Sequence, residues 1–235
     1  MEPRVIFEDD EMLVLDKPPG WVVNEAQTTK HQEVVQKWLR NMPYPLANDY
    51  NMRSGIVHRL DKETSGILLV AKTNDTFKNL QREFKERKVE KTYTALVHGK
   101  VEEDVGSVNA PIGRLPWNRE RFGVLPGGRE AETRYRVISN FQFPISNEKY
   151  SLLELIPKTG RTHQIRVHLK YLGHPIVSDE FYAGRKTSRS DRTWCPRLFL
   201  HASKISFIHP KMKRVVKFNS ELPKDLQFSL KDLRG

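Results

Sequence analysis

The sequence predicts an α+β fold with a mixed, mainly antiparallel central sheet flanked by helices and loops. Short apolar or β-branched runs outnumber helical patterns, and the three or four helical patterns are scattered among them. Strands therefore do not alternate regularly with helices, which argues against a parallel, doubly wound sheet. The 235 residues contain no internal repeat and no linker rich in Pro, Gly and Ser, so we expect a single domain over 1–235.

Each expected strand is a run of apolar, aromatic or β-branched residues, and Pro, Gly or polar residues mark several of the turns between them. The segment 67–71 is apolar throughout, which is typical of a buried strand. In chain order the expected strands are residues 4–7, 12–15, 67–71, 92–98, 133–138, 150–156, 198–207 and 215–218.

The expected helices carry apolar residues at helical spacing. One covers 34–42 and stops at Pro43; a second begins at a cap formed by Asn74 or Asp75 and has a basic outer face. A third covers 162–172, and a terminal helix is expected over 226–233. Two polar, basic segments are expected to be loops, namely 116–130 and 183–197.

The charge of the chain is strongly positive and unevenly distributed. The net charge is +11 at pH 7, yet residues 1–30 carry −4, so the remaining chain carries +15. Such an excess of basic residues indicates a polyanionic partner, most often nucleic acid. A general effect on solubility is the alternative.

The single cysteine, Cys195, excludes an internal disulfide framework and a multi-cysteine zinc site, and it fits a reducing cytosol. The longest purely apolar run has five residues, far short of the roughly 20 that a membrane span needs. The N-terminus has no apolar signal core. We therefore expect a cytoplasmic, soluble protein without a membrane partner.

The densest polar cluster of the chain covers residues 57–66, directly before the apolar run at 67–71. It holds four charged side chains, a histidine and two hydroxyls, which cannot be buried without partners. They must therefore line a turn or a cleft at the entrance of the strand. A solvated structural turn with an Arg59–Asp61 or Lys62–Glu63 ion pair is the alternative.

A second cluster covers residues 159–168, where a glycine turn leads from a strand into a helix. Two arginines at such a helix start could hold a phosphate or keep a carboxylate ionised. A capped basic helix without a ligand is the alternative. His163 and His168 are five residues apart and fall on different helix faces, so a zinc pair is not indicated. Serine-hydrolase, phosphate-loop and dinucleotide-binding motifs do not occur.

Several motifs in order resemble the RluA family of pseudouridine synthases. The run from His58 to Gly66 is similar to the family signature His-Arg-Leu-Asp, two variable residues, then Thr-Ser-Gly. The other matching stretches are Asp16 to Gly20, Lys91 to Gly99, Gly160 to Leu169, and the strands around Leu200 to Ala202 and His209-Pro210. The resemblance extends over nearly the whole chain and implies the pseudouridine synthase fold, with a catalytic cleft across the middle of the sheet.

This resemblance implies isomerisation of uridine to pseudouridine within RNA, without a cofactor or metal. Carried over by position, Asp61 is the catalytic carboxylate and Tyr93 packs on the target base. Arg166 pairs with Asp61, and Arg59 enters the base stack that the uridine leaves. The remaining residues expected to assist RNA binding and base flipping are His58, Arg161 and His163.

Base flipping agrees with the chemistry, because the enzyme must reach C1′ and C5 of a stacked nucleotide. The carboxylate either attacks C1′ or removes the C2′ proton, and the sequence leaves both routes open. The expected partner is ribosomal or transfer RNA, and the expected oligomeric state is a monomer. Many relatives carry an extra N-terminal S4 domain; here the catalytic domain is expected to stand alone.

Two other functions stay open at this point. The same fold could serve as an RNA-folding chaperone with incidental or lost catalysis. A nucleoside or base hydrolase would release uracil, but the lone Asp61 without an evident second carboxylate argues against that class.

Overall fold

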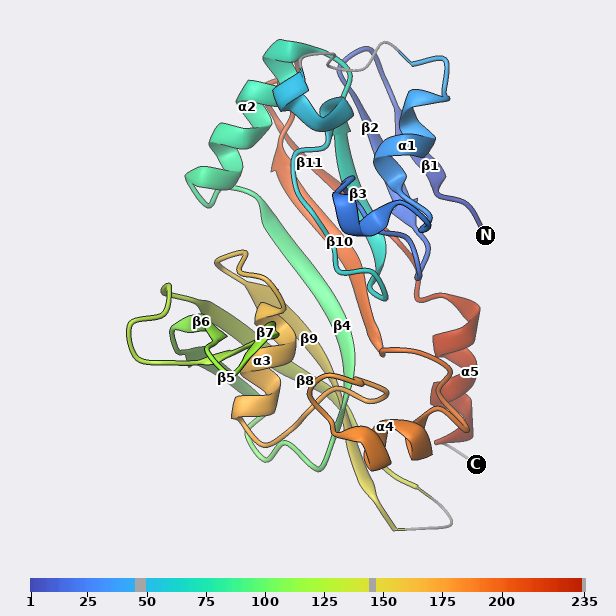
Figure 1. The fold of residues 1–235 in the computed structure, drawn as a ribbon, viewed down its shortest axis with the longest axis vertical. Coiled ribbons are helices and arrows are strands. Elements are labelled where there is room, and N and C mark those ends of the chain that lie inside the picture. The colour runs from blue at the N-terminus through green and yellow to red at the C-terminus, as the bar shows by residue number, and fades with distance from the viewer. Residues whose placement is uncertain (45–49, 144–146, 234–235) are drawn as a thin grey trace. The chain divides into compact units, whose positions relative to one another are not determined.

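The computed structural model describes residues 1–44, 50–143 and 147–233, which form two compact units (Figure 1). The first unit contains Met1–Lys91 and Ala202–Glu221, and the second contains Thr92–His201 and Leu222–Gly235. The chain passes from one unit to the other within β4 (Glu90–His98) and within β10 (Leu200–Ile208). The expectation of one domain stays a prediction.

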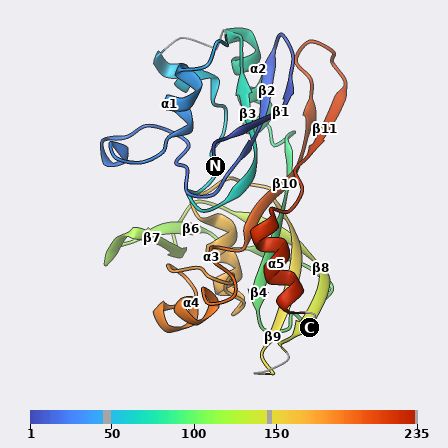
Figure 2. The same ribbon diagram turned by 90° about the vertical axis from the view of Figure 1, so that its right-hand side faces the viewer.

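The first unit is built on strands in the order β1-β2-β3-β10-β11. The pairs β1–β2, β2–β3 and β10–β11 are all antiparallel. In Figure 2 the hairpin of β10 and β11 projects beyond the other strands of this unit. The bounds of the strands not yet given are β1 (Arg4–Glu8), β2 (Met12–Lys17), β3 (Ser65–Ala71) and β11 (Val215–Asn219).

Helix α2 (Asn74–Lys85) covers the core of the first unit. Its apolar side chains Phe77 and Leu80 are buried against Ile67 and Leu69 of β3, together with Phe207 of β10. This stripe has the spacing of an amphipathic helix, so the opposite face of α2 is left to charged residues. The other helical segments of this unit are η1 (Gln27–Thr29), α1 (Val35–Arg40) and η2 (Tyr50–Gly55).

The second unit has strands in the order β4-β9-β8-β5 and a separate β6–β7 hairpin. Each of these pairings is antiparallel. The strands are β5 (Val105–Asn109), β6 (Ile112–Leu115), β7 (Asn118–Val124), β8 (Glu132–Gln142) and β9 (Lys149–Pro157). The helices are α3 (Gln164–Tyr171), α4 (Arg185–Asp191) and α5 (Lys224–Asp232).

The α+β class with mainly antiparallel strands is confirmed, and every strand and helix predicted from the sequence is present. The predicted cap of the second helix is wrong by one residue, because the side chain of Thr73, not of Asn74 or Asp75, accepts the N–H of Thr76 at 3.1 Å. The cleft concerns both units and stays a prediction.

Both loop predictions are wrong in part. Residues 116–130 include β7, whose Phe122 and Val124 pack on the small core around Ile112. Residues 183–197 include α4, which is held by buried polar groups rather than by an apolar stripe, since Ser188 and Asp191 are its buried residues.

Within the described residues, none of the helices is long and apolar enough to cross a membrane.

Candidate active site

Residues 58–66, here called the signature turn, lie in the first unit and lead directly into β3. Lys17, the last residue of β2, is fully buried beside this turn. Its ammonium donates to the backbone carbonyls of Pro18 at 2.9 Å, Trp21 at 3.0 Å and Lys62 at 3.1 Å. Lys17 therefore joins the end of β2 to the signature turn through backbone groups.

The signature turn enters β3 at a position that requires glycine. Gly66 has a φ of +110°, and a Cβ at this residue would lie 2.3 Å from the carbonyl oxygen of Ala202 in β10. Gly66 is also paired with Lys17 across β2 and β3. On the other side, the N–H of Gly20 donates to the carbonyl of Lys62 at 2.8 Å. Gly66 thus allows two backbone segments to meet closely, whereas Gly20, at a φ of +87°, serves the turn by its conformation alone.

His58 fastens the start of the turn to β3. Its Nε2 accepts the N–H of Leu69 at 3.0 Å, and its ring lies 5.0 Å from the ring of Phe84 on α2. Burial, with a smaller effect of the positive charge of Lys91, lowers the pKa of His58 to about 3. The ring is therefore neutral at pH 7 and carries its proton on Nδ1. Its contribution to RNA binding stays a prediction.

The turn presents several polar side chains to solvent, among them the candidates Arg59 and Asp61 and the exposed Lys62. Arg59 is exposed and Asp61 is half-buried. The carbonyl of Asp61 accepts the N–H of Thr64 at 3.2 Å, which closes the turn. The hydroxyl of Thr64 is buried, and within the described residues it has no hydrogen-bond partner.

Tyr93 and Arg166 lie in the second unit. Tyr93 is on β4, opposite Leu155 of β9, and its side chain is 8% exposed. Arg166 is on α3 and is buried. Its Nε donates to Asp179 Oδ2 at 2.7 Å and its Nη2 to Asp179 Oδ1 at 2.8 Å, a bidentate pair that fixes the plane of the guanidinium.

Two aromatic rings lie near the guanidinium of Arg166. The centre of its guanidinium lies 5.4 Å from the ring of Phe181 and 5.1 Å from that of Tyr182. Asp179 Oδ1 also accepts the N–H groups of both aromatic residues, at 3.0 and 3.1 Å. Asp179 thus places the cation and the rings that face it, a favourable cation–π arrangement.

The segment before α3 is fixed by a separate set of contacts. His163, at a left-handed φ of 55°, contacts the hydroxyl of Tyr182 through Nδ1 at 2.9 Å. That hydroxyl also accepts the N–H of Phe122 in β7 at 3.2 Å, so Tyr182 joins His163 to β7. Arg161 donates from Nε to the carbonyl of Glu130 at 3.0 Å.

The structure therefore gathers the candidate residues into one group in each unit. The first unit brings His58, Arg59 and Asp61 onto one turn. The second unit holds Tyr93 on β4 and the candidates within 161–166 at the start of α3. The expected ion pair between Asp61 and Arg166 concerns both units and stays a prediction.

Sequence reasoning missed Lys17, Asp179 and Tyr182 as residues that support the site. A lysine at the end of an expected buried strand is a weak signal of a satisfied ammonium. Asp179 lies between the apolar Val177 and the aromatic Phe181, but nothing in that spacing points to Arg166.

Other reactive groups offer little to the site. Among the described residues, no group of three or more His, Cys, Asp or Glu side chains is arranged to hold a metal ion. Cys195 is fully buried, and burial raises the pKa of its thiol. Its distance from solvent and its protonated state do not suit a nucleophile.

The chain is similar to known proteins over almost its whole length. Residues 11–171 match the family described as RNA pseudouridylate synthase. A ribosomal large subunit pseudouridine synthase D of Nitrosomonas europaea is 39% identical over 99% of this chain and 65% of its own length. An uncharacterized RNA pseudouridine synthase of Bacillus subtilis is 36% identical over 100% of this chain and 74% of its own length.

A solved structure gives the same result for the fold. The human RNA pseudouridylate synthase domain containing 1 has a TM-score of 0.74 and 28% identity, and the match covers 94% of this chain and 84% of that one. The chain spans just under two thirds of the length of the Nitrosomonas relative, at 65%. The matches agree with the motifs quoted from the sequence, and the chain belongs to the RNA pseudouridylate synthase family.

Proposed function

We propose that this protein isomerises uridine to pseudouridine within RNA, with Asp61 as the catalytic carboxylate. The observation that carries the proposal is the signature turn, in which backbone contacts from Lys17 and Gly20 support a turn that presents Asp61 to solvent. Membership of the family supports the same reaction.

The reaction breaks the bond between C1′ and N1 and forms one between C1′ and C5. The proton lost from C5 is balanced by one gained at N1 after the uracil has turned. Substrate and product are isomers, so the net reaction consumes no oxidant, reductant or group donor. Asp61 either attacks C1′ or removes the C2′ proton, and both routes need an ionised carboxylate. The proposed role of Arg166 is to keep Asp61 in that form.

The target nucleotide must leave the base stack before C1′ can be reached, at a cost of a few kcal/mol. Arg59 is exposed on the same turn as Asp61, and a planar guanidinium can stack in the vacated place. Tyr93 would offer a ring to the flipped base. Arg161 and His163 would contact the RNA backbone near α3, and His58 would act by holding the turn.

We propose large-subunit ribosomal RNA as the first substrate to test, because relatives in Nitrosomonas europaea and Vibrio parahaemolyticus carry that RNA in their names. Transfer RNA is the second. A monomer in the cytoplasm is the expected working form, without a membrane partner.

The test compares the wild type with Asp61→Asn on large-subunit ribosomal RNA, with carbodiimide adducts read as primer stops. We expect the isomerisation rate to fall by about 10²- to 10⁴-fold or more, as for removal of a group that acts directly in proton transfer or bond formation. Glu63→Gln on the same turn is the matched control and should keep most of the activity. Equal pseudouridine formation by wild type and Asp61→Asn would refute the role of Asp61. Restored ribosome assembly by Asp61→Asn in cells lacking the protein would favour a chaperone.

A further inference from the structure

Most of the net charge of the chain lies in two short segments of the first unit. Residues 78–91 contain six basic and three acidic side chains, and residues 204–217 contain five basic and no acidic ones. These 28 residues therefore carry +8 of the net charge of +11. The signature turn accounts for little of it.

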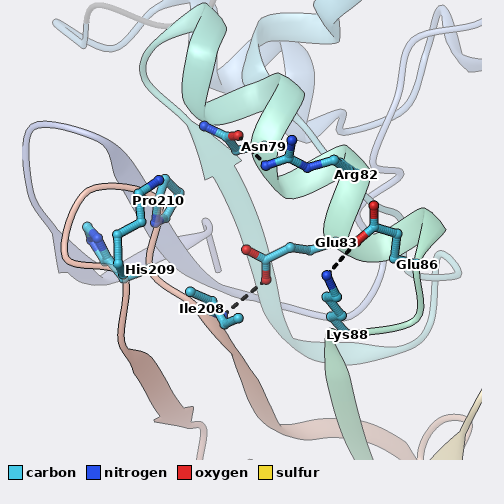
Figure 3. Close-up of a pocket in the computed structure, with 9 residues that line it drawn as sticks. Asn79, Arg82, Glu83, Glu86, Lys88, Ile208, His209 and Pro210 are labelled. Atoms are coloured by element: carbon cyan, nitrogen blue, oxygen red, sulfur yellow. Dashed lines mark hydrogen bonds and ion pairs between the residues drawn. The ribbon is translucent and has the colours of Figure 1, made fainter.

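The two segments meet at a cavity of about 340 Å³ (Figure 3). The end of α2 and the residues after it form one wall, and the turn between β10 and β11 forms the other. In Figure 3 Glu83 lies between the two walls and points to Ile208. The charged or titratable residues that line the cavity are Arg82, Glu83, Glu86, Lys88, His209 and Lys213.

The walls are fixed by contacts that leave the cavity open. Glu83 Oε2 accepts the N–H of Ile208 at 3.0 Å. His209 is buried; its Nδ1 accepts the N–H groups of Lys211 and Met212, at 3.2 and 3.1 Å, and its Nε2 donates to Asp9 at 2.7 Å. Hydrogen bonds therefore fix the backbone of both walls, so a ligand can bind without a large rearrangement.

The two carboxylates of the cavity are already engaged. Glu83 is used by the backbone of β10, and Glu86 pairs with Lys88 at 2.6 Å. Arg82 donates one Nη2 hydrogen bond to Asn79 at 3.0 Å, which orients its guanidinium. An anion would thus meet cations in the cavity rather than uncommitted carboxylates.

Two exposed cations around the cavity have acidic partners, Lys88 with Glu86 and Lys211 with Asp10, and several others do not. Among the described residues, five of them make neither an ion pair nor a side-chain hydrogen bond: Lys78, Lys85, Arg87, Lys213 and Arg214. Three basic residues elsewhere in the first unit are paired, namely Arg4 with Asp16, Arg40 with Glu25, and Lys72 with Glu8. Unpaired like charges repel one another, so their concentration here favours a polyanionic ligand.

Helix α2 connects this surface to the signature turn. Phe84 of α2 lies 5.0 Å from the ring of His58, three residues before Asp61. The residues next to Phe84 in sequence are Glu83, which lines the cavity, and the exposed Lys85. An RNA strand whose target nucleotide lies at Asp61 would therefore have the end of α2 close by.

We propose that the basic face, defined as the cavity and the five unpaired cations around it, binds backbone phosphates of the RNA that flank the target uridine. The proposal rests on the proposed function. Contacts of this kind position the RNA and carry no base preference. Several cations spread over a helix end and a turn suit a strand with many phosphates better than a single small anion.

The test neutralises three cations of the basic face, in the variant Arg82→Gln, Arg87→Gln, Lys213→Gln. Lys30→Gln, Lys37→Gln, Lys224→Gln removes the same charge from exposed positions elsewhere and is the matched control. Binding of fluorescein-labelled oligouridine is measured by anisotropy over a range of salt. The log–log salt slope should become shallower by about 2 in the face variant, at about 0.7 per phosphate contact, and affinity at low salt should fall by about tenfold or more. Oligoadenine should give the same change.

The outcomes separate this proposal from the proposed function. An unchanged salt slope and affinity in the face variant, or an equal change in the control variant, would overturn the proposed role of the basic face. This holds even if the wild type forms pseudouridine. A shallower slope confined to the face variant would support it even if no RNA is isomerised. If inorganic phosphate stabilised the wild type against unfolding while the face variant bound RNA as the wild type does, the cavity would be a small-anion site. That result would overturn the proposal. Should the triple variant fail to fold, Lys213→Gln alone keeps the test, with an expected change of about 0.7.

Discussion

The two units hold their candidate catalytic groups in different ways. In the first, the supports act through backbone groups: Lys17 donates to the carbonyl of Lys62 in the signature turn, and His58 of the turn accepts the N–H of Leu69 in β3. In the second, the support acts on the side chain itself, because the carboxylate of Asp179 accepts two hydrogen bonds from the guanidinium of Arg166.

The difference concerns the freedom of the candidate side chains to change orientation. A turn fixed through its backbone leaves the side chains of Arg59 and Asp61 able to change partners as a substrate enters and the reaction proceeds. A guanidinium gripped by a buried carboxylate and two rings keeps one orientation, which suits a group that provides a fixed positive charge. Substitutions that remove the supports should therefore have different effects in the two units.

The largest effect is expected from Asp179→Ala. Both members of the Arg166–Asp179 pair are buried, and removal of one partner from such a pair costs about 3–5 kcal/mol in the free energy of unfolding. Urea denaturation measures the loss. Glu102→Gln, which breaks an exposed pair with Lys100, is the control and should leave the free energy of unfolding nearly unchanged. If Asp179→Ala lowered the free energy of unfolding as little as the control does, Arg166 would not depend on its ion pair with Asp179.

A smaller effect is expected from Lys17→Met, which leaves the carbonyls of Pro18, Trp21 and Lys62 without this donor. We expect a loss of about 2–4 kcal/mol, less than the sum of separate bonds because a buried charge also disappears. In protein kept folded at low temperature, kcat should fall while RNA affinity changes little. Lys37→Met, at an exposed position of the same unit, controls for the lost charge. Full kcat in folded Lys17→Met would show that the turn keeps its geometry unaided.

The smallest effect, over the first pH unit below 6.5, concerns the titration of His58. The pKa of His58 is lowered from 6.5 to about 3 in the folded protein, so folding favours the neutral ring. This contribution to stability is complete above pH 6.5 and is lost as the pH falls toward 3, at up to about 1.4 kcal/mol per pH unit. His58→Gln keeps an acceptor for Leu69 and removes the titration. Between neutral and mildly acidic pH the free energy of unfolding should fall less in the variant than in the wild type. An identical fall in both would contradict the neutral ring of His58.

Elements with a strong local signal could be predicted from the sequence. The apolar strand β3 and the amphipathic helix α2 were predicted because burial on both faces or on one stripe leaves a period in the residues. The helix α4 has no such period: Ser188 and Asp191 are its buried residues, held by contacts that depend on the tertiary structure. β7 was missed for a related reason, since its charged residues pair with a short strand across a hairpin.

The same limit applies to the site. Asp61 was found because it lies in a dense polar run, and the resemblance gave it a role. Asp179 was not, because its function arises from a partner on another element, 13 residues away, with no periodic relation between them. Lys17 was quoted only as part of a matching stretch, since a sequence does not reveal which carbonyls surround an ammonium.

The contacts at the carbonyl of Lys62 make residue 62 a suitable position for a label. At residue 62, Lys17 and Gly20 contact only the backbone oxygen, which any residue supplies, and the side chain of Lys62 is exposed. Cys195, the one cysteine of the chain, is fully buried. Lys62→Cys would therefore introduce a single reactive thiol beside Asp61 without removal of the native cysteine. A fluorophore attached there would signal the arrival of RNA in real time and separate that step from the chemistry that follows.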